Sequence, residues 1–86
     1  MIVSNVREAV YVSQYSGITP NIVKLREGAR YPYGFDFTTV DKEMMKELFR
    51  LRAEYENNED IRKEFEKDMN VDTLVYLKRM LNAMKY

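Results

Sequence analysis

The sequence predicts a mainly α-helical fold, in which two short helices are followed by a small β-hairpin and then by a longer helical extension. Two observations lead to this prediction. All three glycines and both prolines lie within residues 17–34, so special backbone shapes are confined to one stretch. From residue 39 onward, apolar side chains recur every three or four positions, which is the period of an α-helix.

The composition limits the chemistry that the chain can perform. Its 86 residues have the length of one domain, and no linker or internal repeat divides them, so we expect a single domain over 1–86. There is no cysteine and no histidine, which removes disulfides, thiolate zinc sites and histidine general bases. Asp36 and Asp41 come with no further ligands. We therefore expect no enzyme activity, metal, cofactor or small-molecule substrate.

Targeting signals are not recognisable in the sequence. No run approaches the roughly 20 apolar residues that cross a bilayer. The first ten residues, MIVSNVREAV, have neither the basic nor the apolar region of a signal peptide. We expect a cytoplasmic protein that does not bind a membrane.

The net charge is zero, but the charges are unevenly distributed. Residues 1–35 carry four basic and two acidic side chains, a sum of +2, whereas residues 36–86 carry ten basic and twelve acidic ones, a sum of −2. Three of the four basic residues in the first part lie within the glycine- and proline-containing stretch, where they are available to phosphates. These three are Lys24, Arg26 and Arg30.

The first helix is predicted over about residues 5–15. Asn5 is a good N-cap and is followed three residues later by Glu8, while Gly17 offers a left-handed stop. The alternative is a strand, because AVYVSQYS is rich in β-branched and aromatic residues.

A second, short helix is predicted over Pro20–Glu27. Thr19 is a suitable cap, proline is favoured at the first helical position, and Gly28 would end the helix with a positive φ. Ile22 or Val23 would then face inward together with Leu25. The polar outer face would carry Asn21, Lys24 and Arg26.

The stretch ARYPYGFDFTT has no helical period and predicts a small hairpin. Residues 31–34, Tyr-Pro-Tyr-Gly, are a turn signal, and Phe35 and Phe37 alternate with polar residues as in a short strand. We expect these aromatic side chains to fix the hairpin to the domain rather than to stack on unpaired bases.

Three helices are predicted after the hairpin. Thr39 would cap a helix over about 40–56, and Asn57-Asn58 would end it and cap a second one. Asn70 or Asp72 would cap the last helix. The apolar stripes are Val40, Met44, Leu48, Leu51 and Tyr55 in the first helix, Ile61, Phe65 and Met69 in the second, and Leu74, Leu77, Leu81 and Met84 in the third, widened by Val75, Tyr76 and Met80.

The two short helices and the turn between them form a helix-turn-helix pattern, whose second helix enters the major groove of DNA. With the hairpin that follows, GITPNIVKL and REGARYPYGFDF resemble the winged helix-turn-helix of the excisionase and MerR-like families of phages and mobile elements. The resemblance covers about residues 5–50. Glu8-Ala9 matches the Glu-Ala of the first helix in these families, and Val40 to Leu48 matches the helix after the wing. Residues 51–86 would be a helical extension.

The resemblance implies a small DNA-binding protein, either a transcription regulator or an excisionase-like architectural factor, with double-stranded DNA as its partner. It implies that Thr19, Pro20, Asn21 and Lys24 lie at the major groove and that Arg30, Tyr31 and Tyr33 lie at or near the wing. Independently of the resemblance, Lys24, Arg26 and Arg30 suit phosphates, and the Asn21 amide suits adenine.

Two alternatives remain open. The chain is also compatible with a helical protein-binding module, such as a phage-encoded inhibitor of a host protein, because it is neutral overall and rich in methionine, and its second half is acidic. The apolar stripe of the last helix has a spacing that suits a homodimer as well as packing against the helix over 40–56.

Overall fold

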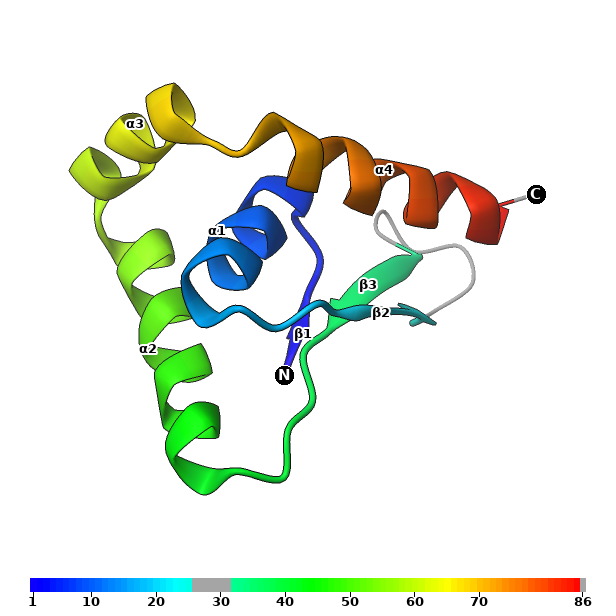
Figure 1. The fold of residues 1–86 in the computed structure, drawn as a ribbon, viewed down its shortest axis with the longest axis horizontal. Helices are drawn as coiled ribbons and strands as arrows, with labels where there is room; N and C mark the ends of the chain where they lie inside the picture. Colours follow the sequence, from blue (N-terminus) through cyan, green and yellow to red (C-terminus); the bar gives the residue numbers. More distant parts are fainter. Residues whose placement is uncertain (26–31, 86) are drawn as a thin grey trace.

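The computed structural model describes residues 1–25 and 32–85, and it is mainly helical with a small antiparallel sheet (Figure 1). Two short segments, β1 and α1, come first and are followed by the two strands β2 and β3. Three consecutive helices, α2, α3 and α4, complete the chain. The bounds are β1 Ile2–Val3, α1 Val6–Ser16, β2 Asn21–Lys24, β3 Tyr33–Asp36, α2 Lys42–Asn57, α3 Glu59–Asp68 and α4 Val71–Lys85.

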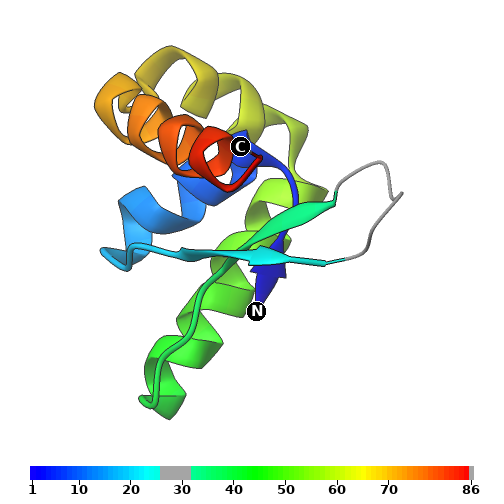
Figure 2. The same ribbon diagram turned by 90° about the vertical axis from the view of Figure 1, so that its right-hand side faces the viewer.

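The sheet has the strand order β1-β3-β2, and both pairings are antiparallel. Figure 2 shows β2 and β3 as the two arms of a hairpin. In the register, Phe35 lies between Val3 and Ile22, and the backbone N–H of Leu25 donates to the carbonyl of Pro32 at the far end of the hairpin. Phe35 and Phe37 are buried, as their alternation with polar residues predicts. The turn predicted at residues 31–34 is wrong for Tyr33 and Gly34, which belong to strand β3 because they pair with β2.

The predicted second helix is wrong, because Asn21–Lys24 forms strand β2. The Thr19-Pro20 signal is local and also suits the start of a strand, where proline removes no ladder donor. Ile22 and Val23 are β-branched, which favours a strand, and all four residues of β2 pair with β3. This pairing is a contact between separate segments, so the local helix signal could not indicate it. Residues 26–31, with the predicted stop at Gly28, lie outside the described residues.

Two positions, 17 and 34, favour glycine for different structural reasons. Gly17 has φ of 77° and ends α1 in the left-handed conformation, as predicted, with its N–H donating to the carbonyl of Ser13. Gly34 is buried in β3, where a Cβ would lie 2.7 Å from a methyl group of Ile2 and 3.0 Å from a methyl group of Leu25. The sheet is therefore packed too closely at Gly34 for a side chain.

Helix α1 confirms the first predicted helix and excludes the strand alternative. The side chain of Asn5 accepts hydrogen bonds from the backbone N–H groups of Arg7 and Glu8, at 2.8 and 3.2 Å. Its buried face includes Ala9, Val10 and Val12. A helix with this buried face can pack against neighbours on two sides.

Helices α2 and α3 agree with the prediction except at the start of α2. Asp41, and not Thr39, caps α2, and it accepts from the N–H groups of Glu43 and Met44. Val40 therefore precedes the helix and is fully exposed instead of joining the apolar stripe. Asn58 ends α2 and caps α3 by accepting from the N–H of Ile61, as predicted.

Helix α4 is capped by Asn70, whose side chain accepts from the N–H of Thr73. Its apolar stripe packs against α1 and β2, not against α2 as expected. Leu77 is fully buried, and Leu74 and Leu81 are partly buried against the core. The prediction fails for three residues of this helix, which are exposed: Val75, Tyr76 and Met84.

One core connects residues 1–50 with the helices that follow. Figure 1 shows α2, α3 and α4 following one another around α1. Phe65 of α3 and Leu77 of α4 belong to the same buried cluster as Val3, Val10 and Phe35. Residues 51–85 thus share the hydrophobic core of residues 1–50.

Candidate functional site

The residues predicted to bind DNA do not form one face of a helix. Thr19, Asn21 and Lys24 are exposed, whereas Pro20 is buried. Tyr33 is half-buried in β3, opposite Lys24. Three of the predicted residues, Arg26, Arg30 and Tyr31, lie outside the described residues.

Strand β2 separates the two side chains that were expected to act together. Successive side chains of a strand point to opposite faces, so Asn21 and Lys24, three positions apart, lie on opposite sides of the sheet. A helix would have placed them on one face. The described residues therefore do not combine base contact by Asn21 with phosphate contact by Lys24 on one surface.

A groove of about 490 Å³ lies between α1, α2 and α3. Tyr11 and Tyr15 of α1 line it together with Leu51 of α2 and with Ile61 and Phe65 of α3. These side chains give the groove an apolar and largely aromatic floor.

The aromatic side chains of the floor are in contact with one another. The ring of Tyr11 lies 4.9 Å from that of Tyr15 and 5.0 Å from that of Phe65, the latter edge to face. Tyr11 and Phe65 are buried, but Tyr15 is 54% exposed. An exposed ring backed by two buried rings is a rigid surface on which a ligand can pack, since little freedom remains to be lost on binding.

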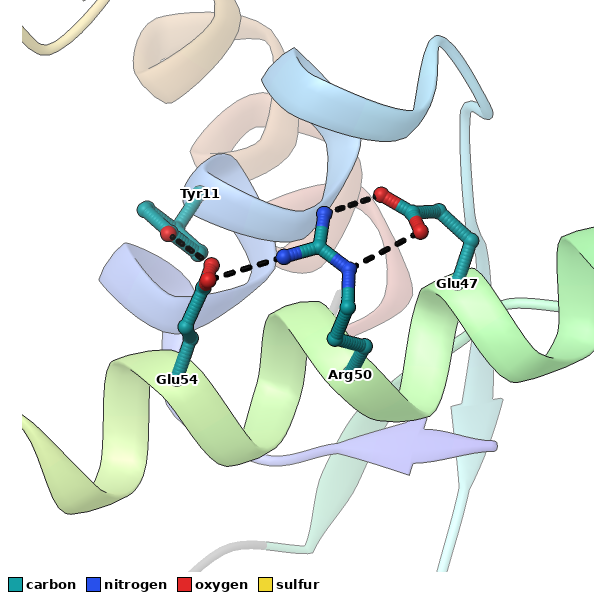
Figure 3. A network of polar contacts seen from close by, with 4 residues as sticks. All are labelled: Tyr11, Glu47, Arg50 and Glu54. Carbon is teal, nitrogen blue, oxygen red and sulfur yellow. Dashed lines mark hydrogen bonds and ion pairs between the residues drawn. The ribbon is translucent and has the colours of Figure 1, made fainter.

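The wall that α2 contributes is a closed network of charged and polar groups (Figure 3). Arg50 lies between Glu47 and Glu54 and pairs with both: Nε donates to Glu47 Oε2 at 2.9 Å and Nη1 donates to Glu54 Oε1 at 2.8 Å. The second oxygen of Glu54 accepts from the hydroxyl of Tyr11 at 2.9 Å. The network therefore ties the α2 wall to the aromatic floor.

The pKa values of these groups follow from their surroundings. Burial raises the pKa of Tyr11 to about 12, and the hydrogen bond to Glu54 adds to the effect, so the hydroxyl remains a donor. The hydrogen bond from Arg50 lowers the pKa of Glu47, and its bond to Glu47 raises the pKa of Arg50. Glu47 and Arg50 therefore keep their opposite charges over a wider range of pH.

The wall that α3 contributes is acidic, and the groove lining includes no basic residue of this helix. Asp60, Glu64 and Asp68 recur every four residues and line the groove from one face of α3. Among the described residues, the nearest ion pair of this row joins Glu64 and Lys67 at 3.9 Å, and both side chains are about three-quarters exposed. The groove lining thus holds five carboxylates and one guanidinium, a sum of −4.

A second carboxylate cluster lies between α1 and α2, outside the groove lining. Glu8 is buried, and its Oε1 lies 3.8 Å from Nε of Arg52 and has no hydrogen-bond partner among the described residues. Arg52 donates to Glu56 at 3.1 Å. Burial raises the pKa of Glu8 to about 7, and the nearby Glu56 adds to the effect, whereas the hydrogen bond from Arg52 lowers the pKa of Glu56.

Sequence reasoning missed the groove because its floor and walls come from three separate helices. The alternating charges of ENNEDIRKEFEKD favour a solvated face, and most of these charged side chains are exposed. The available signal was the four-residue spacing of Asp60, Glu64 and Asp68 beside Ile61 and Phe65. That spacing predicts that the three carboxylates share one face of a helix. It does not predict that Tyr11 and Tyr15 of α1 lie across from them.

The described parts of the chain contain no group of three or more potential metal ligands. Within the same ranges, no helix has the length and the hydropathy needed to traverse a bilayer. Asp36 accepts from the Thr38 hydroxyl, and Asp41 caps α2. Comparisons with models of protein families, with curated proteins and with solved structures find no match to this chain.

Proposed function

We propose that this chain is a non-enzymatic binding protein and that its groove between α1, α2 and α3 binds a basic segment of another protein. The observation that carries the proposal is an exposed aromatic ring beside a wall whose groove-lining charges are all acidic. Tyr15 supplies the exposed ring, and Asp60, Glu64 and Asp68 supply the charge. This conclusion favours the helical protein-binding module over the DNA-binding protein, because the predicted recognition helix is a strand.

The occupant follows from the charge and the size of the groove. A lining charge of −4 attracts lysine or arginine and repels nucleic acid phosphates. A volume of about 490 Å³ holds a few side chains but not a whole helix, so the segment inserts basic and aliphatic side chains. A lysine or arginine over Tyr15 would gain a cation–π contact of about 0.5–2 kcal/mol as well as the charge attraction.

The binding experiment uses an acetylated and amidated Lys-Leu-Leu-Lys-Leu peptide with a fluorescent label, and a peptide with glutamate in place of lysine as the control. We expect fluorescence anisotropy to show binding of the lysine peptide only, weakening as salt rises. Equal binding of both peptides, or of neither, would contradict the proposal.

The exposed ring has a matched control in the same chain. Tyr15 is 54% exposed and Tyr76, on α4 and outside the groove lining, is 53% exposed. We expect Tyr15→Ala to weaken binding of the lysine peptide by about tenfold, because the cation loses its aromatic surface, and Tyr76→Ala to leave it unchanged. Equal losses in both variants would assign the effect to general surface hydrophobicity.

The acidic wall has its own matched pair on α3. Glu64 lines the groove, whereas Glu66 lies two residues away, pairs with Arg7 at 3.3 Å and does not line it. Glu64→Gln and Glu66→Gln change the net charge equally. We expect only Glu64→Gln to reduce the affinity and the salt dependence, and circular dichroism melts would verify that both variants fold.

A second candidate is the DNA-binding function, now through the β2–β3 hairpin. The observation in its favour is the exposed Lys24 at the end of β2, directly before the sequence that contains Arg26 and Arg30. Two-stranded β-ribbons are able to enter a DNA groove, so the loss of the helix does not remove this function.

The test of DNA binding is fluorescence anisotropy on a labelled duplex at low salt. We expect Lys24→Ala to weaken binding to all duplexes and to reduce the slope of log K against log salt by about one per protomer. Asn21→Ala would instead relax base preference, at about 1–3 kcal/mol per base contact. Absence of duplex binding by the wild-type protein at micromolar concentration would exclude the candidate.

A further inference from the structure

We propose that Arg50 is a built-in competitor for the cation of the partner, because its guanidinium occupies the α2 wall of the groove. The inference rests on the proposed function and names a specificity-determining residue of that same site. A lysine or arginine of the partner first meets the α3 wall, which has no cation in the groove lining, and it reaches the α2 wall only by displacing Arg50. Arg50 therefore sets how strongly basic segments bind.

The geometry gives Arg50 the position of a bound ligand. Its guanidinium contacts Glu47 through Nε and Nη2 and contacts Glu54 through Nη1, so one planar group serves two carboxylates (Figure 3). All three residues line the groove. The α2 wall sums to −1 with Arg50 in place, and removal of that charge would leave −2.

Displacement of Arg50 is feasible because its ion pairs are open to water. The Arg50 side chain is 54% exposed, and its pairs with Glu47 and Glu54 span only three and four residues of one helix. Exposed pairs of this kind contribute little free energy, since water and salt screen them. A partner cation that also packs on the aromatic floor gains contacts in addition to the ion pairs that Arg50 makes, and these contacts favour the exchange.

The carboxylate of Glu54 has a second hydrogen-bond partner that does not depend on Arg50. Its Oε2 accepts from the hydroxyl of Tyr11, whose ring is fixed by Tyr15 and Phe65. This hydrogen bond orients the carboxylate independently of the guanidinium. The α2 wall thus becomes a second, preorganised anionic surface once Arg50 moves away.

The experiment compares Arg50→Gln with Lys63→Gln in the full chain, using the lysine peptide and its glutamate control. Both substitutions remove one positive charge and leave carboxylates without their ion-pair partner. Arg50→Gln removes the partner of Glu47 and Glu54. Lys63→Gln removes the partner of Glu59, which lies 3.4 Å from the Lys63 amine. Glu59 does not line the groove. The pair therefore separates a local effect from a change in net charge.

We expect Arg50→Gln to bind the lysine peptide about three- to tenfold more tightly than the wild type and to show a steeper salt dependence, because two carboxylates become available. Lys63→Gln should stay within about twofold of the wild type. Equal or weaker binding by Arg50→Gln relative to Lys63→Gln would overturn the inference.

The outcomes also separate this inference from the proposed function. If the wild type does not bind the lysine peptide but Arg50→Gln does, Arg50 blocks the groove and the inference stands, while the proposed function of the native chain fails. If neither protein binds, both are overturned. If the wild type binds and Arg50→Gln brings no gain, only the role of Arg50 is excluded.

Discussion

The two arginine–glutamate clusters of α2 contain the same groups but behave differently. Arg50 pairs with Glu47 and Glu54 at the edge of the groove, where all three side chains are more than a third exposed. Arg52 lies two residues further along the helix. It pairs with Glu56 and also with the buried Glu8 of α1. In the Arg50 cluster the pKa of the exposed Glu47 is lowered, whereas in the Arg52 cluster, where only Glu8 is buried, the pKa of Glu8 is raised.

The difference shows that solvent access decides what an arginine does for a carboxylate. At Glu47 the hydrogen bond from Arg50 dominates, because water still hydrates the charge. At Glu8 the loss of hydration exceeds the attraction of Arg52, which lies 3.8 Å away. The Arg50 cluster is thus available for exchange with a ligand, whereas the Arg52 cluster affects the stability of the fold through the buried Glu8.

The largest effect is expected for removal of the cation beside the buried Glu8. Arg52→Gln should lower the free energy of unfolding at pH 8 by about 1.5–2 kcal/mol, because the charged form of Glu8 loses its attraction until the group takes up a proton, and Glu56 loses its ion pair. Urea titrations measure this change. At pH 5, where Glu8 is protonated in the folded state, the difference should shrink to below about 1 kcal/mol. An effect that is independent of pH would show that Arg52 acts through packing alone.

A smaller effect with a defined pH window is expected for Glu8. Its folded pKa of about 7 lies above the ordinary value of 4.5, so its contribution to stability is complete below pH 4.5 and is lost as the pH rises through 7. The pKa of Glu56 is shifted downward, so its contribution is lost instead on acidification below its ordinary range. The interval from pH 5 to 8 therefore reports on Glu8.

Over that interval the wild-type protein should lose roughly 1–2 kcal/mol of stability, and Glu8→Gln should remove most of this dependence. Thermal melts at several pH values provide the measurement, with Glu66→Gln as the exposed control. A wild-type stability that stays constant or rises from pH 5 to 8 would contradict the assigned shift.

The next effect concerns the hydroxyl that connects the aromatic floor to the Arg50 cluster. Tyr11→Phe removes the hydrogen bond to Glu54 but keeps the ring packed against Phe65. We expect a loss of about 0.5–1 kcal/mol in the free energy of unfolding, the usual contribution of one hydrogen bond. A loss above about 2 kcal/mol would mean that the ring itself has moved, which near-ultraviolet circular dichroism detects.

The smallest effect is expected for the exposed cation. Arg50→Gln should change the free energy of unfolding by less than about 0.5 kcal/mol, because exposed pairs within one helix are screened by water. The comparison with Arg52→Gln is direct, since the two variants differ only in which side of α2 loses its charge. Similar losses in both would eliminate the distinction between the clusters.

The helices of this fold could be predicted from the sequence because their signals are local. Asn5, Gly17, Asn58 and Asn70 are caps or stops that act within a few residues of themselves, and each is found where it was expected. Asp41 displaced Thr39 as a cap within the same turn, so the error there is only two residues.

The strands and the groove could not be predicted because they depend on contacts between distant residues. Strand β2 follows a helix-like Thr-Pro signal, but four to eight residues form a weak helix on their own, and pairing with β3 prevails. Ile2-Val3 is β-branched, yet its strand exists only through Phe35 and Asp36. The groove likewise needs Tyr15 opposite Asp68, a juxtaposition across more than fifty residues.

The position of β3 at the centre of the sheet has a consequence for biosynthesis. Strands β1 and β2 both precede β3 in the chain, and both pair with it rather than with each other. On the ribosome, neither strand has its partner until Asp36 has emerged, whereas α1 is able to form earlier from its own caps. Because Phe65 and Leu77 complete the core, nascent chains that end before α4 would expose the apolar faces of α1 and the sheet to chaperones.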